Sequence, residues 1–459
     1  MRRAGVALGR AGHKCVGPAA GHSSGGACPK APAMTTSPPP SSPSPALSMP
    51  RWELVGMVAA LMALNALAID VFIPALTEIG EALAVEEANR RQFVISAYVM
   101  GFGAAQLFYG TISDRFGRRP VLMFGLAVYV AASALAAYAP NFESLLAIRF
   151  IQGVGTAATR VIAVSVVRDT FGGARMASVM SLVMMVFMAV PLIAPNVGQV
   201  IILFGNWQSV FWVTGILGAV MAVWSYLRLP ETLHPEYRLP LTFSRVSAAF
   251  RVVVTTRASF GYSLATALTF AVLFAFINQA EQLFTQTFGM GEMFTLAFSA
   301  IALFMALSSF MNSRLVERLG MRRLSHLALS LFLALIMSGL VLAFTLGDSF
   351  PVWLFGILMA MLFACFGFTG TNFNALAMDP LGHVAGTASS VLGFMQTFVG
   401  GVLGALIGYL YDGTVVPLFI GYLLLALGAV ACVAVAEGGR LFGPDDDLSI
   451  VPAAVQDAD

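Results

Sequence analysis

The stretch Gly110-Thr111-Ile112-Ser113-Asp114-Arg115-Phe116-Gly117-Arg118-Arg119 is a polar island between two long apolar runs. Because Gly110 and Gly117 carry no side chain, helix ends can approach each other and the backbone can turn sharply between them. One carboxylate and three guanidinium groups are available for charge-assisted hydrogen bonds: Asp114, Arg115, Arg118 and Arg119. We interpret the stretch as a tight hinge between two membrane helices, with these residues forming a gate.

Composition places the flanking apolar runs in a membrane. Of 459 residues, 58% are hydrophobic and only 10% are charged, and the mean hydropathy is +0.83. Such a chain cannot form a soluble surface, so it is an integral membrane protein. The formal net charge of +2 gives no indication of nucleic-acid binding.

Cysteine usage and motif content indicate no cofactor. Cys15, Cys28, Cys365 and Cys432 form neither a disulfide framework nor a metal-ligand spacing. No Gly-x-x-x-x-Gly-Lys-Ser/Thr loop occurs, so ATP is not the expected energy source. Since no nucleophile and base or metal cluster falls at a shared depth, we do not expect an enzyme.

Apolar stretches of about 20 residues recur from Trp52 onward, and each is long enough to cross the bilayer as a helix. Residues 1–50 are rich in Pro, Ser, Gly and Ala and are expected to be disordered. The twelve predicted spans are 52–74, 92–111, 120–139, 143–166, 177–199, 207–228, 259–282, 292–312, 324–346, 351–374, 384–410 and 415–436.

Arginine in the loops predicts the orientation, because short loops rich in Lys and Arg stay in the cytoplasm. The alternate loops carry almost none, apart from Arg90 and Arg91. Both termini are therefore expected to be cytoplasmic. Arginines of the predicted cytoplasmic loops are Arg115, Arg118, Arg119, Arg168, Arg175, Arg238, Arg245, Arg251, Arg257, Arg314, Arg318, Arg322 and Arg323.

A repeat divides the chain into two six-helix halves. We expect one bundle at 51–229, a cytoplasmic linker at 230–258, a second bundle at 259–436 and a cytoplasmic tail at 437–459. A shift of 203 positions sets Asp114 on Glu317 and Gly117 on Gly320. Two such halves are typical of a transporter with its site between them, at the membrane midplane. The second-half counterpart of the gate comprises Arg314, Glu317, Arg318, Gly320 and Arg322.

Several motifs occurring in order resemble the major facilitator superfamily. They are the Gly110–Arg119 island, Arg149-Phe-Ile-Gln152-Gly153-Val-Gly155, and Pro191-Leu-Ile-Ala-Pro195-Asn-Val-Gly198. Within that superfamily the chain is similar to the Bcr/CflA group of drug/proton antiporters. This narrower resemblance rests on Asp70-Val-Phe-Ile-Pro74-Ala75, Arg168-Asp169, Pro230-Glu231-Thr232-Leu233 and Ala385-Gly386-Thr387-Ala388-Ser389.

The resemblance implies roles for two of these motifs. Asp114 is expected to bond arginines or the end of a neighbouring helix, and so to hold the cytoplasmic side shut in one state. Pro191, Pro195 and Gly198 correspond to a helix-bending antiporter motif, although this copy lacks the terminal glycine pair.

Asp70 and Arg149 are the ionisable residues best placed inside the hydrocarbon layer, where an uncompensated charge costs at least about 2.5 to 3.5 kcal/mol. Helix rise places both roughly 6 to 9 Å below the outer face. We hypothesise that they approach one another, directly or through water, with Gln152 as a further residue of the same site, and that rearranging the pair binds and releases a proton. The alternative is a static ion pair that fixes helix register.

Other polar residues have plainer interpretations. Arg160 is expected to reach the lipid headgroups from the inner end of its helix. Glu281 either lines an outer vestibule or begins an external loop. Asn372 and Asn374 are expected to bond neighbouring helices rather than substrate.

These features predict a twelve-helix secondary transporter of the bacterial inner membrane. The expected partners are the lipid bilayer, a small amphipathic substrate that is exported, and H⁺, with the proton gradient as energy source. We expect a functional monomer with no metal, organic cofactor or nucleic acid. Two alternatives stay open: a proton-coupled importer of a metabolite, and a transport-inactive sensor or scaffold with the same fold.

Overall fold

The computed structural model describes residues 49–171, 173–233, 236, 238, 243–439 and 442. All belong to one unit, Pro45–Asp459. The predicted disordered tail lies outside the described residues except for Met49 and Pro50, and so does most of the tail predicted at 437–459.

The described residues form helices and no strands, which confirms the all-helical prediction. Eleven segments are long and apolar enough to cross a membrane, and Ala189–Phe204 is a shorter apolar helix within the described residues. It is part of α6, which has 32 residues. The first half contains α1 (Arg51–Asp70), α2 (Leu76–Ala82), α3 (Phe93–Phe116), α4 (Arg118–Ala136), α5 (Phe142–Thr170), α6 (Gly173–Phe204) and α7 (Trp207–Arg228). The remainder contains α8 (Phe243–Thr255), α9 (Arg257–Gln282), α10 (Phe294–Leu319), α11 (Met321–Leu346), α12 (Val352–Met378), α13 (Ala385–Phe394), α14 (Gly400–Tyr409) and α15 (Val416–Ala436).

The first crossing segment is broken after Asp70. α1 ends there, and the chain continues through the short helix η1 (Ile73–Ala75) into α2. Pro74 explains the break, because its ring has no N–H and clashes with the carbonyl group four residues earlier, which belongs to Asp70. The break therefore positions an acidic residue at a helix end inside the membrane-spanning region.

The predicted polar hinge is shorter than expected. α3 continues to Phe116 and α4 begins at Arg118, so only Gly117 is non-helical, with φ 101° and ψ 160°. Gly320 repeats this conformation between α10 and α11, with φ 80° and ψ 152°. Such positive φ values favour glycine. The sequence repeat is thus matched by a repeat in backbone geometry, and most of the expected loop is helix.

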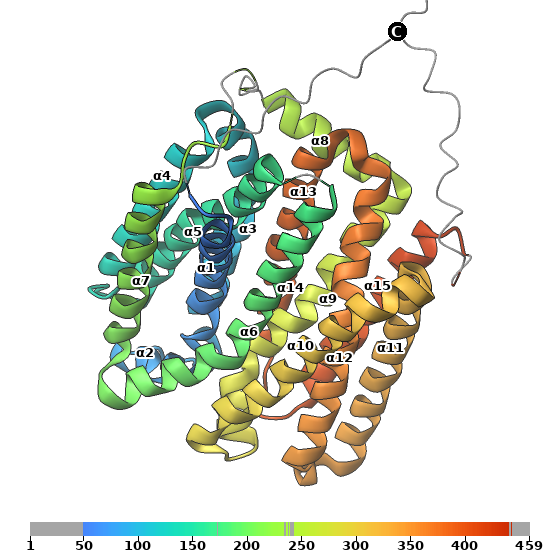
Figure 1. Cartoon of the computed structure of the whole chain (residues 1–459). Coiled ribbons are helices and arrows are strands. Elements are labelled where there is room, and N and C mark those ends of the chain that lie inside the picture. The colour runs from blue at the N-terminus through green and yellow to red at the C-terminus, as the bar shows by residue number, and fades with distance from the viewer. Residues whose placement is uncertain are drawn as a thin grey trace, which may run out of the picture. The chain divides into compact units, whose positions relative to one another are not determined.

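Two groups of helices are visible in Figure 1, with α4, α5 and α7 in one and α11, α12 and α15 in the other. We call α1–α7 the first half and α9–α15 the second half. The halves meet where α6 packs on α10 and where α3 packs on α13 and α14. We call the end that carries Arg118 and Arg322 the arginine end, and the end that carries Thr77 and Glu281 the opposite end.

The α3 contact includes a helix irregularity. Between α13 and α14 lies η8 (Met395–Val399), a single π-helical turn. A Cβ atom on Gly103 of α3 would lie 2.6 Å from the backbone nitrogen of Phe398, so the two backbones touch there. Such π turns frequently occur at functional sites. The predicted linker also contains a helix that the sequence did not indicate, α8, which packs on α9 and α13.

Candidate functional site

A cavity of about 210 Å³ lies between the two halves. Its lining comes from α1, α3, α5 and α6 on one side and from α9, α10, α12 and η8 on the other. Among the described residues that line it, the charged ones are Asp70 and Arg160. The polar uncharged side chains are Asn65, Thr371, Asn374, Gln396 and Thr397.

Asp70 reaches this cavity from the broken end of α1. It is 3% exposed, yet no hydrogen bond or ion pair to its carboxylate occurs among the described residues. Gly198 of α6 packs against the same break, because a Cβ atom there would lie 2.2 Å from the Val71 carbonyl oxygen. The break thus holds a carboxylate that is buried, unpaired and turned toward the space between the halves.

No direct ion pair between Asp70 and Arg149 occurs among the described residues. Arg149 is fully buried, and its Nη2 donates to the Ala68 carbonyl oxygen at 3.1 Å. Its Nε donates to the Val94 carbonyl oxygen at 3.0 Å. Ala68 is in the last turn of α1, where carbonyl groups lack intrahelical donors. Arg149 therefore lies near the depth of Asp70, as expected, but its guanidinium satisfies open backbone carbonyls instead of the carboxylate.

Arg149 and Gln152 also lie outside the cavity lining. The Arg149 Nη1 donates to the Gln152 Oε1 at 2.6 Å, and the Gln152 Nε2 donates to the Ser133 Oγ at 2.6 Å. The guanidinium carbon lies 4.2 Å from the ring centroid of Phe72 and 4.6 Å from that of Tyr98. These contacts join α1, α3, α4 and α5 around Arg149 without the static Asp70–Arg149 ion pair that the alternative interpretation required.

Arg160 corrects a second expectation. The sequence analysis predicted that its side chain reaches the lipid headgroups. In the structure this side chain lines the cavity. Sequence alone could not assign the facing side of α5. No hydrogen bond or ion pair to Arg160 occurs within the described part of the chain.

The second-half wall of the cavity is rich in phenylalanine. Phe276 stacks on Phe298 with centroids 5.4 Å apart, and Phe270 meets Phe366 edge-on at 4.8 Å. The described lining contains no charged residue from α9 or α12. Six phenylalanines line this side: Phe270, Phe274, Phe276, Phe298, Phe363 and Phe366.

Asn372 and Asn374 differ in position. The Asn372 Nδ2 donates to the Asn312 Oδ1 at 2.8 Å, so it bonds a neighbouring helix. Asn374 faces the cavity and donates to the Gln396 Oε1 at 3.3 Å.

Of the predicted gate residues, Asp114 contacts the side chain of Arg118, which is 2% exposed. Its Nη1 donates to the Asp114 Oδ1 at 2.6 Å, and its Nε donates to the Asp169 Oδ2 at 2.9 Å. The Ser113 hydroxyl accepts a further bond at 2.7 Å. These partners all lie in the first half, so the described ion pairs tie α3, α4 and α5 to one another rather than one half to the other.

Glu231 completes this cluster. Its two carboxylate oxygens accept the backbone N–H groups of Arg118 at 2.9 Å and Arg119 at 3.2 Å. A carboxylate at a helix N-terminus stabilises the first turn, here that of α4. We call Ser113, Asp114, Arg118, Asp169 and Glu231 the gate cluster. Asp169 and Glu231 were not predicted as site residues, although both stand in motifs that carried the family resemblance.

The remaining gate predictions fall in different surroundings. A Cβ atom on Gly110 would lie 2.7 Å from the Ser390 Oγ of α13, so Gly110 marks close packing between the halves. Arg119 donates a hydrogen bond to the Tyr226 carbonyl oxygen, and its guanidinium lies over the Tyr226 ring. Arg115 is exposed and has no hydrogen-bond or ion-pair partner among the described residues.

In the second-half counterpart of the gate, the buried arginine pairs with a different acidic residue from the one predicted. Arg322 is buried and pairs with Glu437, which follows α15, at 3.3 Å. The Tyr262 hydroxyl donates to the same Glu437 Oε1 at 2.5 Å. Arg314, Glu317 and Arg318 are exposed, so the sequence match of Glu317 to Asp114 has no matching ion pair. Glu437 follows the last helix of its half much as Glu231 follows α7.

Pro191 and Pro195 both lie inside α6, which continues as one helix past them. Pro191 lines the cavity. Near it, the Asn196 Nδ2 donates to the Ser299 Oγ of α10 at 2.7 Å. The Ser299 hydroxyl donates in turn to the Leu192 carbonyl oxygen at 2.7 Å. The proline segment is therefore part of the contact between the halves.

The opposite end is closed by hydrogen bonds between the halves. The Thr77 hydroxyl donates to the Glu281 Oε1 at 2.5 Å. The Asn89 Nδ2 donates to the carbonyl oxygens of Tyr409 at 3.0 Å and Tyr411 at 2.6 Å. Of the two interpretations of Glu281, neither describes this contact: the residue is 7% exposed, lies in α9 and accepts a hydrogen bond from the first half.

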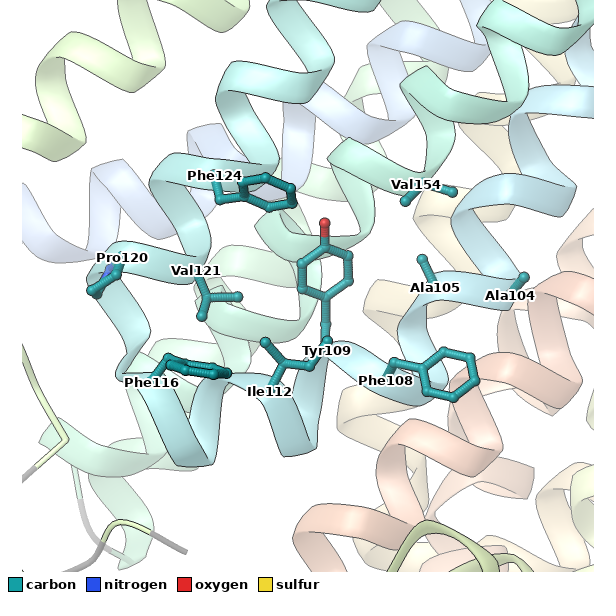
Figure 2. Close-up of a pocket in the computed structure, with 10 residues that line it drawn as sticks. All are labelled: Ala104, Ala105, Phe108, Tyr109, Ile112, Phe116, Pro120, Val121, Phe124 and Val154. Carbon is teal, nitrogen blue, oxygen red and sulfur yellow. The ribbon is translucent and has the colours of Figure 1, made fainter. Parts of the chain in front are cut away.

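A larger hollow of about 580 Å³ lies elsewhere, between α3, α4 and α5 (Figure 2). Tyr109 stands in its middle, and Phe108, Phe116 and Phe124 at its edges are strongly exposed. Apart from the Tyr109 hydroxyl its lining is apolar. Without charged groups it offers little for recognition, so the cavity between the halves is the better candidate site. No group of residues that could hold a metal ion occurs in the described ranges.

Eleven candidate membrane spans, together with α6, surround a central cavity in the described part of the chain, an arrangement typical of a membrane transporter. The profile of the Major Facilitator Superfamily matches residues 58–405. The chain belongs to this superfamily.

Its relatives include proteins named for drug resistance. A bicyclomycin resistance protein homologue of Haemophilus influenzae is 28% identical over 368 residues, 80% of this chain and 90% of the relative. The multidrug resistance protein MdtL of Salmonella heidelberg is 30% identical over 381 residues, with coverage of 82% and 93%. The predicted resemblance is thus confirmed, and the chain is a transporter related to efflux proteins.

Solved structures agree on the fold. A D-xylose-proton symporter has a TM-score of 0.66 at 14% identity and covers 85% of this chain and 97% of its own. A bacterial homologue of the lysosomal transporter Spinster has a TM-score of 0.64 at 14% identity, with coverage of 85% and 96%. At this identity the likeness shows the fold alone.

Proposed function

We propose that this transporter exports small amphipathic compounds in exchange for protons, by alternating access of the cavity between its halves. The observation that carries the proposal is Asp70, the one carboxylate among the described residues that line the cavity. A carboxylate with no fixed partner can take up and release a proton as rocking of the halves changes its contact with water.

The cavity supports an exporter of apolar or amphipathic cargo over an importer of polar metabolites. A metabolite importer is expected to place charged residues of α9 or α12 in the cavity, and the described lining has none from either helix. The names of the drug-resistance relatives also support export rather than import. A transport-inactive scaffold would have no need of an unpaired buried carboxylate, whose burial is costly.

The gate cluster, the helix-bending prolines and the membrane orientation belong to the same proposal. Arg118 and its partners hold α3, α4 and α5 together at the arginine end during rocking. Pro191, Pro195 and Gly198 let α6 bend where it meets α10 and the break after Asp70. Both termini lie in the cytoplasm of a bacterial cell, and the protein works as a monomer in the inner membrane.

Transport in everted membrane vesicles tests the proposal. We expect uptake of a compound panel that includes bicyclomycin to follow an imposed pH difference in wild-type vesicles. Asp70→Asn abolishes the response to the pH difference, and Asp70→Glu retains part of it. Asp348→Asn removes an exposed carboxylate and serves as the matched control with full activity.

Proton flux is recorded in the same vesicles with a pH-sensitive dye. Uptake by Asp70→Asn that still responds to the pH difference, with protein present in the membrane at the wild-type level, excludes Asp70 as the coupling group. Wild-type vesicles that move no member of the panel in either direction contradict the exporter assignment.

A further inference from the structure

We propose that Arg160 binds an anionic group of the transported compound, so that the cargo is an amphiphile with a carboxylate, phosphate or sulfonate beside an aromatic or apolar body. This inference deepens the proposed function, on which it rests only in taking the central cavity as the place where cargo binds.

An arginine in a membrane helix ordinarily extends its side chain to the lipid headgroups. The depth of Arg160 and the direction of its side chain exclude this explanation. α5 has 29 residues, so it is about 43 Å long, and Arg160 lies ten residues, or about 15 Å, before its end at Thr170. With a hydrocarbon layer of about 30 Å centred on the helix, Arg160 lies roughly 9 Å below the surface. Its side chain is directed into the cavity rather than toward that surface.

The other polar groups of the cavity have partners, which distinguishes them from the two charged residues. The Asn65 Oδ1 accepts the Tyr98 hydroxyl at 3.0 Å, and the Thr397 hydroxyl accepts the Gln106 Nε2 at 2.8 Å. On α12, Thr371 accepts from Asn312 at 3.0 Å, and Asn374 bonds Gln396. Among the polar and charged side chains of described residues that line the cavity, only those of Asp70 and Arg160 have no hydrogen bond or ion pair.

An arginine without a partner at this depth is costly, by at least about 2.5 to 3.5 kcal/mol at a helix centre. A ligand anion offsets this cost. The guanidinium is always charged and presents a planar fork of N–H donors that matches a carboxylate or phosphate in two parallel bonds. Arg160 and Asp70 form no ion pair with each other, so the guanidinium donors are available to cargo.

The sign of the cargo charge follows from the difference between the two groups. Asp70 is the proposed proton carrier, and it is neutral whenever it holds the proton. Arg160 keeps its charge in every state, so it repels cationic cargo and attracts anionic cargo. The six phenylalanines of the opposite wall supply a surface for the rest of the compound, since aromatic side chains bury large apolar area.

Equilibrium dialysis against purified protein in phosphatidylcholine nanodiscs tests this inference, with empty nanodiscs subtracted. The probes share one ring system and differ in charge: 2-naphthoate, 2-naphthamide and 2-naphthylmethylammonium. We expect wild-type protein to bind the carboxylate about tenfold or more tighter than the amide, and the ammonium most weakly. Arg160→Gln brings the carboxylate to within about twofold of the amide, while Arg160→Lys keeps the preference for the anion.

A merely structural role for Arg160 predicts a different result, in which Arg160→Gln weakens all three probes alike. That result overturns the proposal. So do equal binding of carboxylate and amide to wild type, preference for the ammonium, or no binding of any probe. Should Arg160→Gln fail to fold, the order of the probes on wild type and Arg160→Lys decides. Dialysis needs no gradient, so this test and the vesicle test of proton coupling fail independently.

Discussion

Removing the Arg118 side chain is the most informative perturbation of the gate cluster. Arg118→Ala deletes the ion pairs to Asp114 at 2.6 Å and to Asp169 at 2.9 Å. It also leaves two carboxylates close together without a shared cation. Arg115→Ala removes the same charge from the same helix-end region, but from an exposed residue with no hydrogen-bond or ion-pair partner in the described ranges. The two variants therefore separate the specific network from the loss of one positive charge.

The expected losses of folding stability differ several-fold between Arg118→Ala and Arg115→Ala. Breaking a buried ion pair by removing one partner costs about 3 to 5 kcal/mol. The side chains of Asp114 and Asp169 are 25% and 15% exposed, so water partly replaces the lost partner. We therefore expect the lower bound, about 3 kcal/mol, for Arg118→Ala. An exposed substitution such as Arg115→Ala changes stability by about 0.5 kcal/mol or less.

Thermal unfolding of detergent-purified protein, followed by intrinsic fluorescence, provides the assay. Trp52, Trp207, Trp212 and Trp224 lie in the first half, so the signal reports mainly on the half that contains the gate cluster. The midpoint falls by several degrees for Arg118→Ala and stays near wild type for Arg115→Ala. Equal midpoints for the two variants refute the network. In Arg118→Ala/Asp169→Asn, the second change recovers part of the loss because one of the two neighbouring carboxylates loses its charge.

Four further substitutions, one of them a control, test local geometry by the same thermal assay. Gly198→Ala places a Cβ atom 2.2 Å from the Val71 carbonyl oxygen and costs about 1 to 3 kcal/mol. Gly356→Ala is the control, because nothing lies within 4 Å of a Cβ atom there, and it is neutral or stabilising by up to about 1 kcal/mol. Equal effects at these two glycines contradict the close packing of α6 on the α1 break. Gly117→Ala strains a residue with φ 101° and lowers stability by about 1 to 3 kcal/mol, and a neutral result excludes the one-residue hinge. Arg149→Lys supplies one nitrogen where three atoms donate to Ala68, Val94 and Gln152, so it costs about 3 kcal/mol; an unchanged midpoint contradicts the anchoring role of Arg149.

Sequence reasoning reached the fold because the membrane imposes strong constraints. Apolar stretches of about 20 residues predict crossing helices without knowledge of their packing. The helix bounds were nevertheless displaced where polar residues continue a helix beyond the hydrocarbon layer. At Gly110–Arg119, polarity and glycine indicated a loop, but only Gly117 leaves the helical conformation. The helix α8 was missed because its length and composition do not meet the criterion for a crossing segment.

For the candidate site, the sequence predicted how deep in the membrane its charged residues lie, but not which way their side chains face. Counting helix rise placed Asp70 and Arg149 at a shared level, and the contact of Arg149 with Ala68 agrees with that level. Whether two side chains at one level meet depends on how each helix is rotated, which composition does not reveal. For the same reason Arg160 was assigned to the headgroups. The break after Asp70 could have been inferred, since Pro74 removes the N–H that would bond the Asp70 carbonyl.

Alternating access through the central cavity is the claim on which the account depends, and a reversible cross-link across the opposite end tests it most directly. Cysteines replace Thr77 and Glu281, whose side chains are hydrogen-bonded across the halves at 2.5 Å, in a background with the four native cysteines changed to serine. Joining them with a bifunctional thiol-reactive reagent, whose spacer contains a disulfide, prevents this end from opening. The account predicts that cross-linked protein in vesicles stops exporting and recovers when the linker is reduced, while single-cysteine controls are unaffected. Export at the wild-type rate with the cross-link complete would contradict it.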